Sequence, residues 1–133
     1  MRMVIMALMA AGVLAAPAHA KPPLREVAAI DDALLDLGIA DRIRKNCPSI
    51  SARMFRAIGY VNDLQAKARS MGYTDAEIEA YTESDAEKDR MKARGAAFFR
   101  ARGVDTSDPE SYCALGRAEI QKSSRIGSLL RAK

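Results

Sequence analysis

The chain has 133 residues, of which 49% are hydrophobic, 29% charged and 5% aromatic, and its formal net charge is +4 at pH 7. That length suits one domain, because a single hydrophobic core organises roughly 100–150 residues. The apolar and charged fractions exclude a disordered chain, a collagen-like repeat and a membrane protein with several spans.

The first 20 residues predict a cleaved signal peptide. Arg2 precedes an uncharged apolar run over residues 3–16, and residues 18–20 (Ala-His-Ala) have the small–x–small pattern that signal peptidase accepts. A retained membrane anchor is the alternative, but a spanning helix needs about 20 apolar residues, and this run meets Pro17 first. We expect cleavage after Ala20 and a periplasmic or secreted protein.

Cleavage there removes His19, the single histidine of the chain. A protein without imidazole has no Ser-His-Asp triad, no Cys-His nucleophile pair, and no His-ligated zinc or haem. An EF-hand loop starting at Asp75 fails, because Ala80 and Ala86 occupy the positions that need Gly and Glu. We expect no cofactor and no metal.

Cys47 and Cys113 predict one structural disulfide, because an exported protein meets an oxidising compartment. Closing a loop of this length contributes roughly 4 kcal/mol to stability. The alternatives are two free thiols or an intermolecular bridge. A redox-active pair would need C-x-x-C spacing, which the chain lacks.

Apolar residues at steps of three and four predict helices throughout residues 21–133, and no alternating Val, Ile or Thr run predicts a strand. The expected fold is an all-α, single-domain bundle of about five to six helices, stapled by the disulfide. The expected helices cover residues 24–46 with a break at Gly38, 50–71, 75–82, 85–102 and 109–122.

The helix expected over residues 50–71 has the most regular apolar stripe, and we predict that it is the central helix with its stripe in the core. The stripe consists of Ile50, Met54, Ile58, Val61, Leu64, Ala68 and Met71, widened by Phe55 and Ala57. Three later helix starts have the capping-box pattern, with Ser or Thr followed three residues later by Glu. These starts are at Thr74, Ser84 and Ser107.

Charge is distributed unevenly along the chain. Residues 75–87 contain six acids and no base, whereas residues 88–102 contain six bases and one acid. Helix electrostatics explain this pattern, because acids stabilise helix N-termini and bases stabilise C-termini. Nucleic acid is not an expected partner, because the bases are interleaved with acids and the protein is expected outside the cytoplasm.

The C-terminal segment, residues 117–133, carries the excess positive charge. It has five bases and one acid, Glu119. Ile126, Leu129 and Leu130 lie among these charges, so the segment could close the core, or it could contact an envelope protein or an anionic membrane surface. The candidate contact residues are Arg117, Lys122, Arg125, Arg131 and Lys133.

Several segments resemble a known family. They are residues 38–41 (GIAD), 44–54 (RKNCPSISARM), 72–78 (GYTDAEI) and 108–116 (DPESYCALG). They are similar to recurrent segments of small exported bacterial proteins in domain-of-unknown-function family 5333, over essentially all of residues 21–133. The resemblance implies an exported, helical, disulfide-bonded domain. It implies no activity, ligand or catalytic residue.

Two classes of function remain. The favoured one is a non-enzymatic binding or accessory module of the cell envelope, because the sequence lacks nucleophile, phosphate-binding and metal-binding motifs. Four tyrosines are candidate contact residues, although each is equally suited to the edge of the core with its hydroxyl in water. They are Tyr60, Tyr73, Tyr81 and Tyr112.

The alternative is a carboxylate-dependent hydrolase acting on cell-wall glycans. Paired carboxyl groups need no histidine, provided that burial raises the pKa of one of them. Asp31, Asp32 and Asp36 are the least ordinary acids, because they lie within an apolar helix. A solvated helix face is still the expected setting for them.

Overall fold

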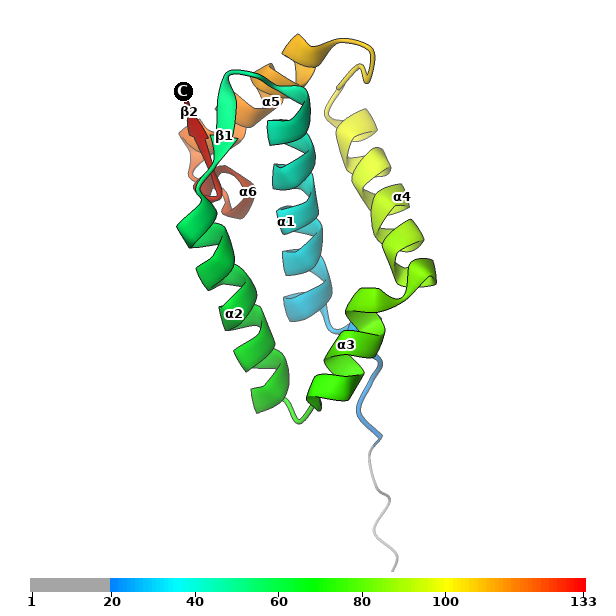
Figure 1. The fold of residues 1–133 in the computed structure, drawn as a ribbon. Helices are drawn as coiled ribbons and strands as arrows, with labels where there is room; N and C mark the ends of the chain where they lie inside the picture. Colours follow the sequence, from blue (N-terminus) through cyan, green and yellow to red (C-terminus); the bar gives the residue numbers. More distant parts are fainter. Residues whose placement is uncertain (1–19) are drawn as a thin grey trace, which may run out of the picture.

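A computed structural model of the protein describes residues 20–133 (Figure 1), so residues 1–19 of the expected signal peptide, His19 included, lie outside the described residues. The described chain is mainly helical, and the all-α fold class is confirmed. Its elements are the short 3-10 helix η1 (Leu24–Glu26), α1 (Ala28–Asn46), β1 (Ile50–Ala52), α2 (Met54–Ser70), α3 (Asp75–Glu83), α4 (Asp85–Ala101), α5 (Pro109–Lys122), α6 (Arg125–Ser128) and β2 (Leu130–Ala132). Within residues 20–133, no helix combines the length and the apolar character that a bilayer span needs.

Helix α1 is the centre of the fold. It lies between α2 and α4 and also contacts α5 and α6, which gather near its C-terminal end (Figure 1). The prediction of a central helix over residues 50–71 is therefore wrong. Helix α2 is peripheral, because it turns only a narrow face toward α1: Ala68 is its one fully buried residue, and Met54, Phe55, Ile58 and Met71 are exposed.

Gly38 does not break α1, which runs continuously over Ala28–Asn46. Glycine weakens a helix by about 1 kcal/mol relative to alanine, but its neighbours Ile39 and Ala40 are buried in the main core cluster. Because burial of these flanking residues stabilises the helix more than the glycine weakens it, the helix passes through the predicted break.

Ile50 begins a strand, not a helix, which corrects the prediction that the chain has no strand. Strand β1 pairs antiparallel with β2, with Ile50 opposite Ala132 and Ala52 opposite Leu130. The backbone N–H of Arg53 then donates to the Leu129 carbonyl, at 2.8 Å. The partner strand lies some eighty residues further along the chain. The pairing therefore cannot be predicted from the periodicity of the residues around Ile50.

The three predicted capping boxes differ in the structure. Thr74 forms the complete reciprocal box with Glu77. The Ser84 hydroxyl accepts a hydrogen bond from the backbone N–H of Glu87. The Glu87 carboxylate pairs with Arg25 and Arg90 instead of accepting from the backbone N–H of Ser84. The third box is wrong, because Asp108 and not Ser107 is the N-cap of α5, directly before Pro109 at the first helical position.

The C-terminal segment closes the core. Ile126, Leu129 and Leu130 are all buried and belong to the main core cluster. Gly127 allows this packing, because it lies against the backbone of Glu119: a Cβ at position 127 would be 1.9 Å from the Glu119 carbonyl oxygen. The interpretation of residues 117–133 as a core-closing segment therefore agrees with the burial of its apolar residues.

The predicted disulfide is present. Cys47, which caps the C-terminus of α1, is bonded to Cys113 in α5, and their Cα atoms are 5.1 Å apart. Both residues are buried in the main cluster. The bridge therefore fixes the end of α1 to α5 at the point where the chain turns toward β1.

Replacing both cysteines (Cys47→Ala with Cys113→Ala) should lower the free energy of unfolding by about 4 kcal/mol. The reason is that the unfolded chain regains the entropy of an open loop between residues 66 positions apart. Urea denaturation of the variant and the oxidised wild type measures the difference. Dithiothreitol-treated wild type is the matched control and should unfold together with the variant. Equal stability of the variant and the oxidised protein would contradict the prediction.

Gly127→Ala should destabilise the protein by about 3 kcal/mol, because the new methyl group overlaps a backbone that has no rotamer to change. Gly38→Ala is the matched control. It places a methyl group where nothing lies within 4 Å and should stabilise α1 by about 0.5–1 kcal/mol. Thermal unfolding compares the two, and a Tm for Gly127→Ala at or above that of wild type would show that the segment docks differently.

Candidate functional site

Asp31 is the centre of a buried charge cluster. It projects from the first turn of α1 and is 4% exposed. Two arginines of α4 donate to its carboxylate: Arg90 through both guanidinium Nη atoms, one of them at 3.1 Å, and Arg94 through Nη1. The hydroxyl of Tyr81, from α3, donates to the same carboxylate. The cluster therefore ties α1 to α3 and α4.

The surroundings of Asp31 determine its pKa. Burial alone would raise the pKa of its carboxyl, but hydrogen bonds from Arg90 and Tyr81 and the charges of Arg90 and Arg94 outweigh burial and hold that pKa below the ordinary value. The same contacts raise the pKa of Arg90, and burial together with Asp31 raises the pKa of Tyr81. Asp31 is therefore ionised and fully engaged at neutral pH.

The expectation that Asp31 lies on a solvated face is wrong. Arg90 and Arg94 lie four residues apart on one face of α4, and the sequence pattern alone predicts only that they stabilise that helix electrostatically. The sequence signal for the cluster is an acid between the apolar residues Ile30 and Ala33, with Asp32 beside it, together with a pair of arginines at helical spacing. That signal gives no partner, because 59 and 63 residues separate the arginines from Asp31.

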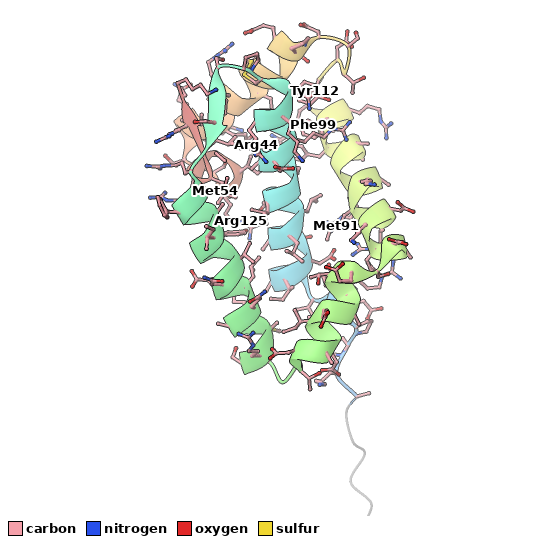
Figure 2. All side chains as sticks on the ribbon, in the orientation of Figure 1. Arg44, Met54, Met91, Phe99, Tyr112 and Arg125 are labelled. Atoms are coloured by element: carbon pink, nitrogen blue, oxygen red, sulfur yellow. A yellow bond between two sulfur atoms is a disulfide. The ribbon has the colours of Figure 1, made fainter. Side chains whose placement is uncertain are left out.

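Asp32 and Asp36, the other two candidate acids of α1, are less buried than Asp31. Asp32 is about half exposed and accepts from Arg94 at 2.7 Å. Asp36 is partly buried and pairs with Arg125 at 2.8 Å, and Arg125 lies between α1 and α2 (Figure 2). Burial raises the pKa of Asp36, and the nearby charge of Asp32 adds to this, while Arg125 opposes it.

A cleft of about 670 Å³ lies beside the start of the described chain. It is lined by residues 20–25, by Tyr73 in the loop before α3, and by residues of α3 and the start of α4, among them Glu77, Tyr81 and Glu87. Glu77 is paired with Lys21 at 2.9 Å, and Glu87 with Arg25 at 3.1 Å and Arg90 at 2.7 Å. The cap hydrogen bond from the Thr74 backbone and the contact with Lys21 lower the pKa of Glu77. Asp36 is not among the residues that line this cleft.

The four candidate tyrosines are buried or half-buried. Tyr112 and Tyr73 are buried. The hydroxyl of Tyr73 donates to the Pro22 carbonyl, and that of Tyr60 donates to the Ala33 carbonyl at 3.0 Å. The hydroxyls of Tyr60, Tyr73 and Tyr81 therefore donate to protein oxygens, which corrects the expectation that they face water.

The five basic residues of the C-terminal segment fall into two groups. Arg117 pairs with Glu110, Lys122 with Glu119 at 3.1 Å, and Arg125 with Asp36. Arg131 donates to the Ser51 hydroxyl at 3.2 Å. Neither Arg131 nor Lys133 forms an ion pair with the part of the chain that the structure describes.

A cluster of exposed apolar side chains lies at the start of α2, which follows the strand that pairs with Arg131. Phe55 is 93% exposed, Met54 56% and Ile58 52%. Met54 lies at the N-terminal end of α2, at the edge of the molecule (Figure 2), and the β1–β2 pair places Arg131 at the same end. We call this region the Phe55 surface. It comprises Arg53, Met54, Phe55, Arg56, Ile58, Arg131 and Lys133.

Comparison with known proteins identifies the family. The chain matches a family of unknown function, DUF5333, over residues 22–131. The chain belongs to the DUF5333 family. No curated protein and no solved structure is detectably similar to it. The match spans the described fold from the residue after Lys21 to β2, so the charge cluster and nearly all of the Phe55 surface lie within the DUF5333 domain.

Replacement of Asp31 tests the charge cluster of this DUF5333 protein. Asp31→Asn should lower the free energy of unfolding at neutral pH by about 3–5 kcal/mol, because it leaves two arginines without their buried counter-charge. Asp32→Asn is the matched control. Its carboxylate is 46% exposed, and loss of an exposed pair costs about 1 kcal/mol or less.

The same variant has a predicted pH dependence. The folded-state pKa of Asp31 lies below the ordinary 3.8, so the ionised carboxylate stabilises the fold above that value, and this contribution is lost as the pH falls through the folded-state pKa. The stability gap between wild type and Asp31→Asn should therefore narrow in urea titrations taken down to about pH 3. A gap that stays constant with pH would contradict the prediction.

Proposed function

We propose that this protein is exported and acts in the cell envelope as a small, non-enzymatic binding module. The pattern of residues 1–20 supports export. A disulfide between Cys47 and Cys113 persists in an oxidising compartment and is rare in the cytosol. Membership of a family of unknown function assigns no activity to the chain.

The distribution of charge supports binding over catalysis. A glycan hydrolase needs a carboxyl group of raised pKa facing a second carboxylate across a cleft. In the cleft beside residues 20–25, Glu77 and Glu87 are both held in ion pairs. Asp36 has a raised pKa but does not line that cleft. The hydrolase alternative therefore has no supporting constellation in this cleft.

The observation that carries the proposal is the Phe55 surface. Large apolar side chains in full contact with water are unfavourable, and a contiguous exposed patch marks an interaction site. Phe55 is 93% exposed, although the same helix has an inward face where an aromatic ring could be buried. The surface gives the module a place to make contact that does not disturb its core.

Photocrosslinking in intact cells tests this proposal. With p-benzoylphenylalanine in place of Phe55, we expect an adduct with an envelope component, whereas the same substitution at Arg100, an exposed position on α4, should give none. The protein recovered from the envelope should begin at Lys21 and contain no free thiol, by intact mass. Recovery from the cytosol with residues 1–20 attached, or equal crosslinking at both positions, would refute the proposal.

A further inference from the structure

We infer that the Phe55 surface docks onto an anionic lipid membrane, an inference that rests on the proposed binding function and names its partner. Phe55 and Ile58 protrude from the start of α2, and Met54 lies beside them at a pocket of about 100 Å³. Phe55 and Ile58 lie on the outward face of the helix, and Met54 flanks them. Protruding apolar side chains on one helix face enter the boundary between headgroups and acyl chains, about 5–10 Å deep.

Bases predominate around these side chains, and the one acid that lines the pocket beside Met54, Asp41, is paired with Arg44 and Lys45. Between Cys47 and Asn62 the chain contains two bases, Arg53 and Arg56, and no acid. Strand β2 adds Arg131, and Lys133 follows it. Among the described residues, none of these four cations is paired with a carboxylate. Lipid phosphates match such a surface, because basic side chains beside an apolar face are attracted to anionic headgroups.

The pairing of β1 with β2 brings two of these cations together. Arg53 follows β1 directly, and its backbone N–H donates to the Leu129 carbonyl, so it lies beside the start of β2. Arg131 is opposite Ser51, and the Lys133 N–H donates to the Ser49 carbonyl at 2.9 Å. Arg53 and Arg131, bases from two distant parts of the sequence, therefore lie close together beside the start of α2, whereas Lys133 lies opposite Ser49, at the other end of the strand pair.

Two other partners, a second copy of the chain and a different protein, fit the Phe55 surface less well. A second copy of the chain would bring two clusters of four unpaired cations into contact, and like charges across an interface cost several kcal/mol. A stable protein–protein interface takes about 800 Å² from each partner, which is more than three protruding side chains supply. A membrane needs neither a complementary pocket nor a large flat area.

Vesicle binding tests the inference with the disulfide-bonded protein recovered from the envelope. The probes are vesicles of phosphatidylglycerol and phosphatidylethanolamine in equal amounts, and vesicles of phosphatidylcholine alone. We expect co-sedimentation with the anionic vesicles that weakens as salt is added, and little binding to the neutral ones. Phe55→Ser should reduce binding about tenfold or more. Arg53→Gln and Arg56→Gln should each reduce it about fivefold.

Matched controls separate this surface from general properties of the protein. Met71→Ser removes another exposed apolar side chain, at the opposite end of α2, and Arg100→Gln removes an exposed cation on α4. Both should bind as wild type does. All five variants change exposed residues, so their thermal unfolding should match that of wild type.

Three outcomes of the vesicle experiment would overturn the inference. They are absence of binding to anionic vesicles, equal binding to neutral vesicles, and binding that Phe55→Ser and Arg53→Gln leave unchanged. A dimer that Phe55→Ser dissociates in sedimentation experiments would identify a second copy as the occupant. A crosslink from position 55 to a protein, without vesicle binding, would refute the membrane as partner and leave the proposed binding function intact.

Discussion

The structure depends on holding α1 at both of its ends. At the C-terminal end, the bond between Cys47 and Cys113 joins α1 covalently to α5. At the N-terminal end, the buried carboxylate of Asp31 joins α1 to two arginines of α4 and to Tyr81 of α3. A core of this size leaves little stability to spare. The two attachments also differ physically, since one responds to reducing agents and the other to pH, so each can be removed without the other.

These attachments also decide which charges remain available at the surface. Arg90 and Arg94 are taken up by Asp31, Arg125 by Asp36, and Lys122 by the buried carboxylate of Glu119. Much of the basic charge that the sequence concentrates in residues 88–102 and 117–133 is therefore engaged in ion pairs with acids of the fold, although the side chains of Lys122 and Arg125 remain more than half exposed. Arg53, Arg56 and Arg131 of the Phe55 surface lie around the start of α2, and no described acid forms an ion pair with them. Binding through this surface thus leaves the ion pairs of the interior undisturbed.

Much of this fold is predictable from the sequence, and the limits have specific physical causes. Helix starts at Thr74 and Ser84 are local, because each cap bonds within its own first turn. The bridge between Cys47 and Cys113 is predictable because two cysteines allow one intramolecular pair. The strand at Ile50, the burial of Asp31 and the peripheral position of α2 depend on partners far along the chain. Periodicity cannot supply them: the stripe from Met54 to Met71 has helical spacing, but it does not tell whether protein or solvent covers that face. For the same reason the sequence pattern predicts Phe55 in the core, whereas its side chain is exposed.

The C-terminal segment shows that core closure and surface contact are not exclusive. Successive residues of a strand point to opposite sides, and at β2 Leu130 is buried while Arg131 is exposed. The same three residues therefore complete the main core cluster on one side and supply a cation to the Phe55 surface on the other. Deleting the whole segment would not separate its role in stability from its role in binding. Loss of Ile126, Leu129 and Leu130 opens the core regardless of what Arg131 contacts. Only a change confined to the exposed charges separates binding from stability, because it leaves every buried contact of the segment in place.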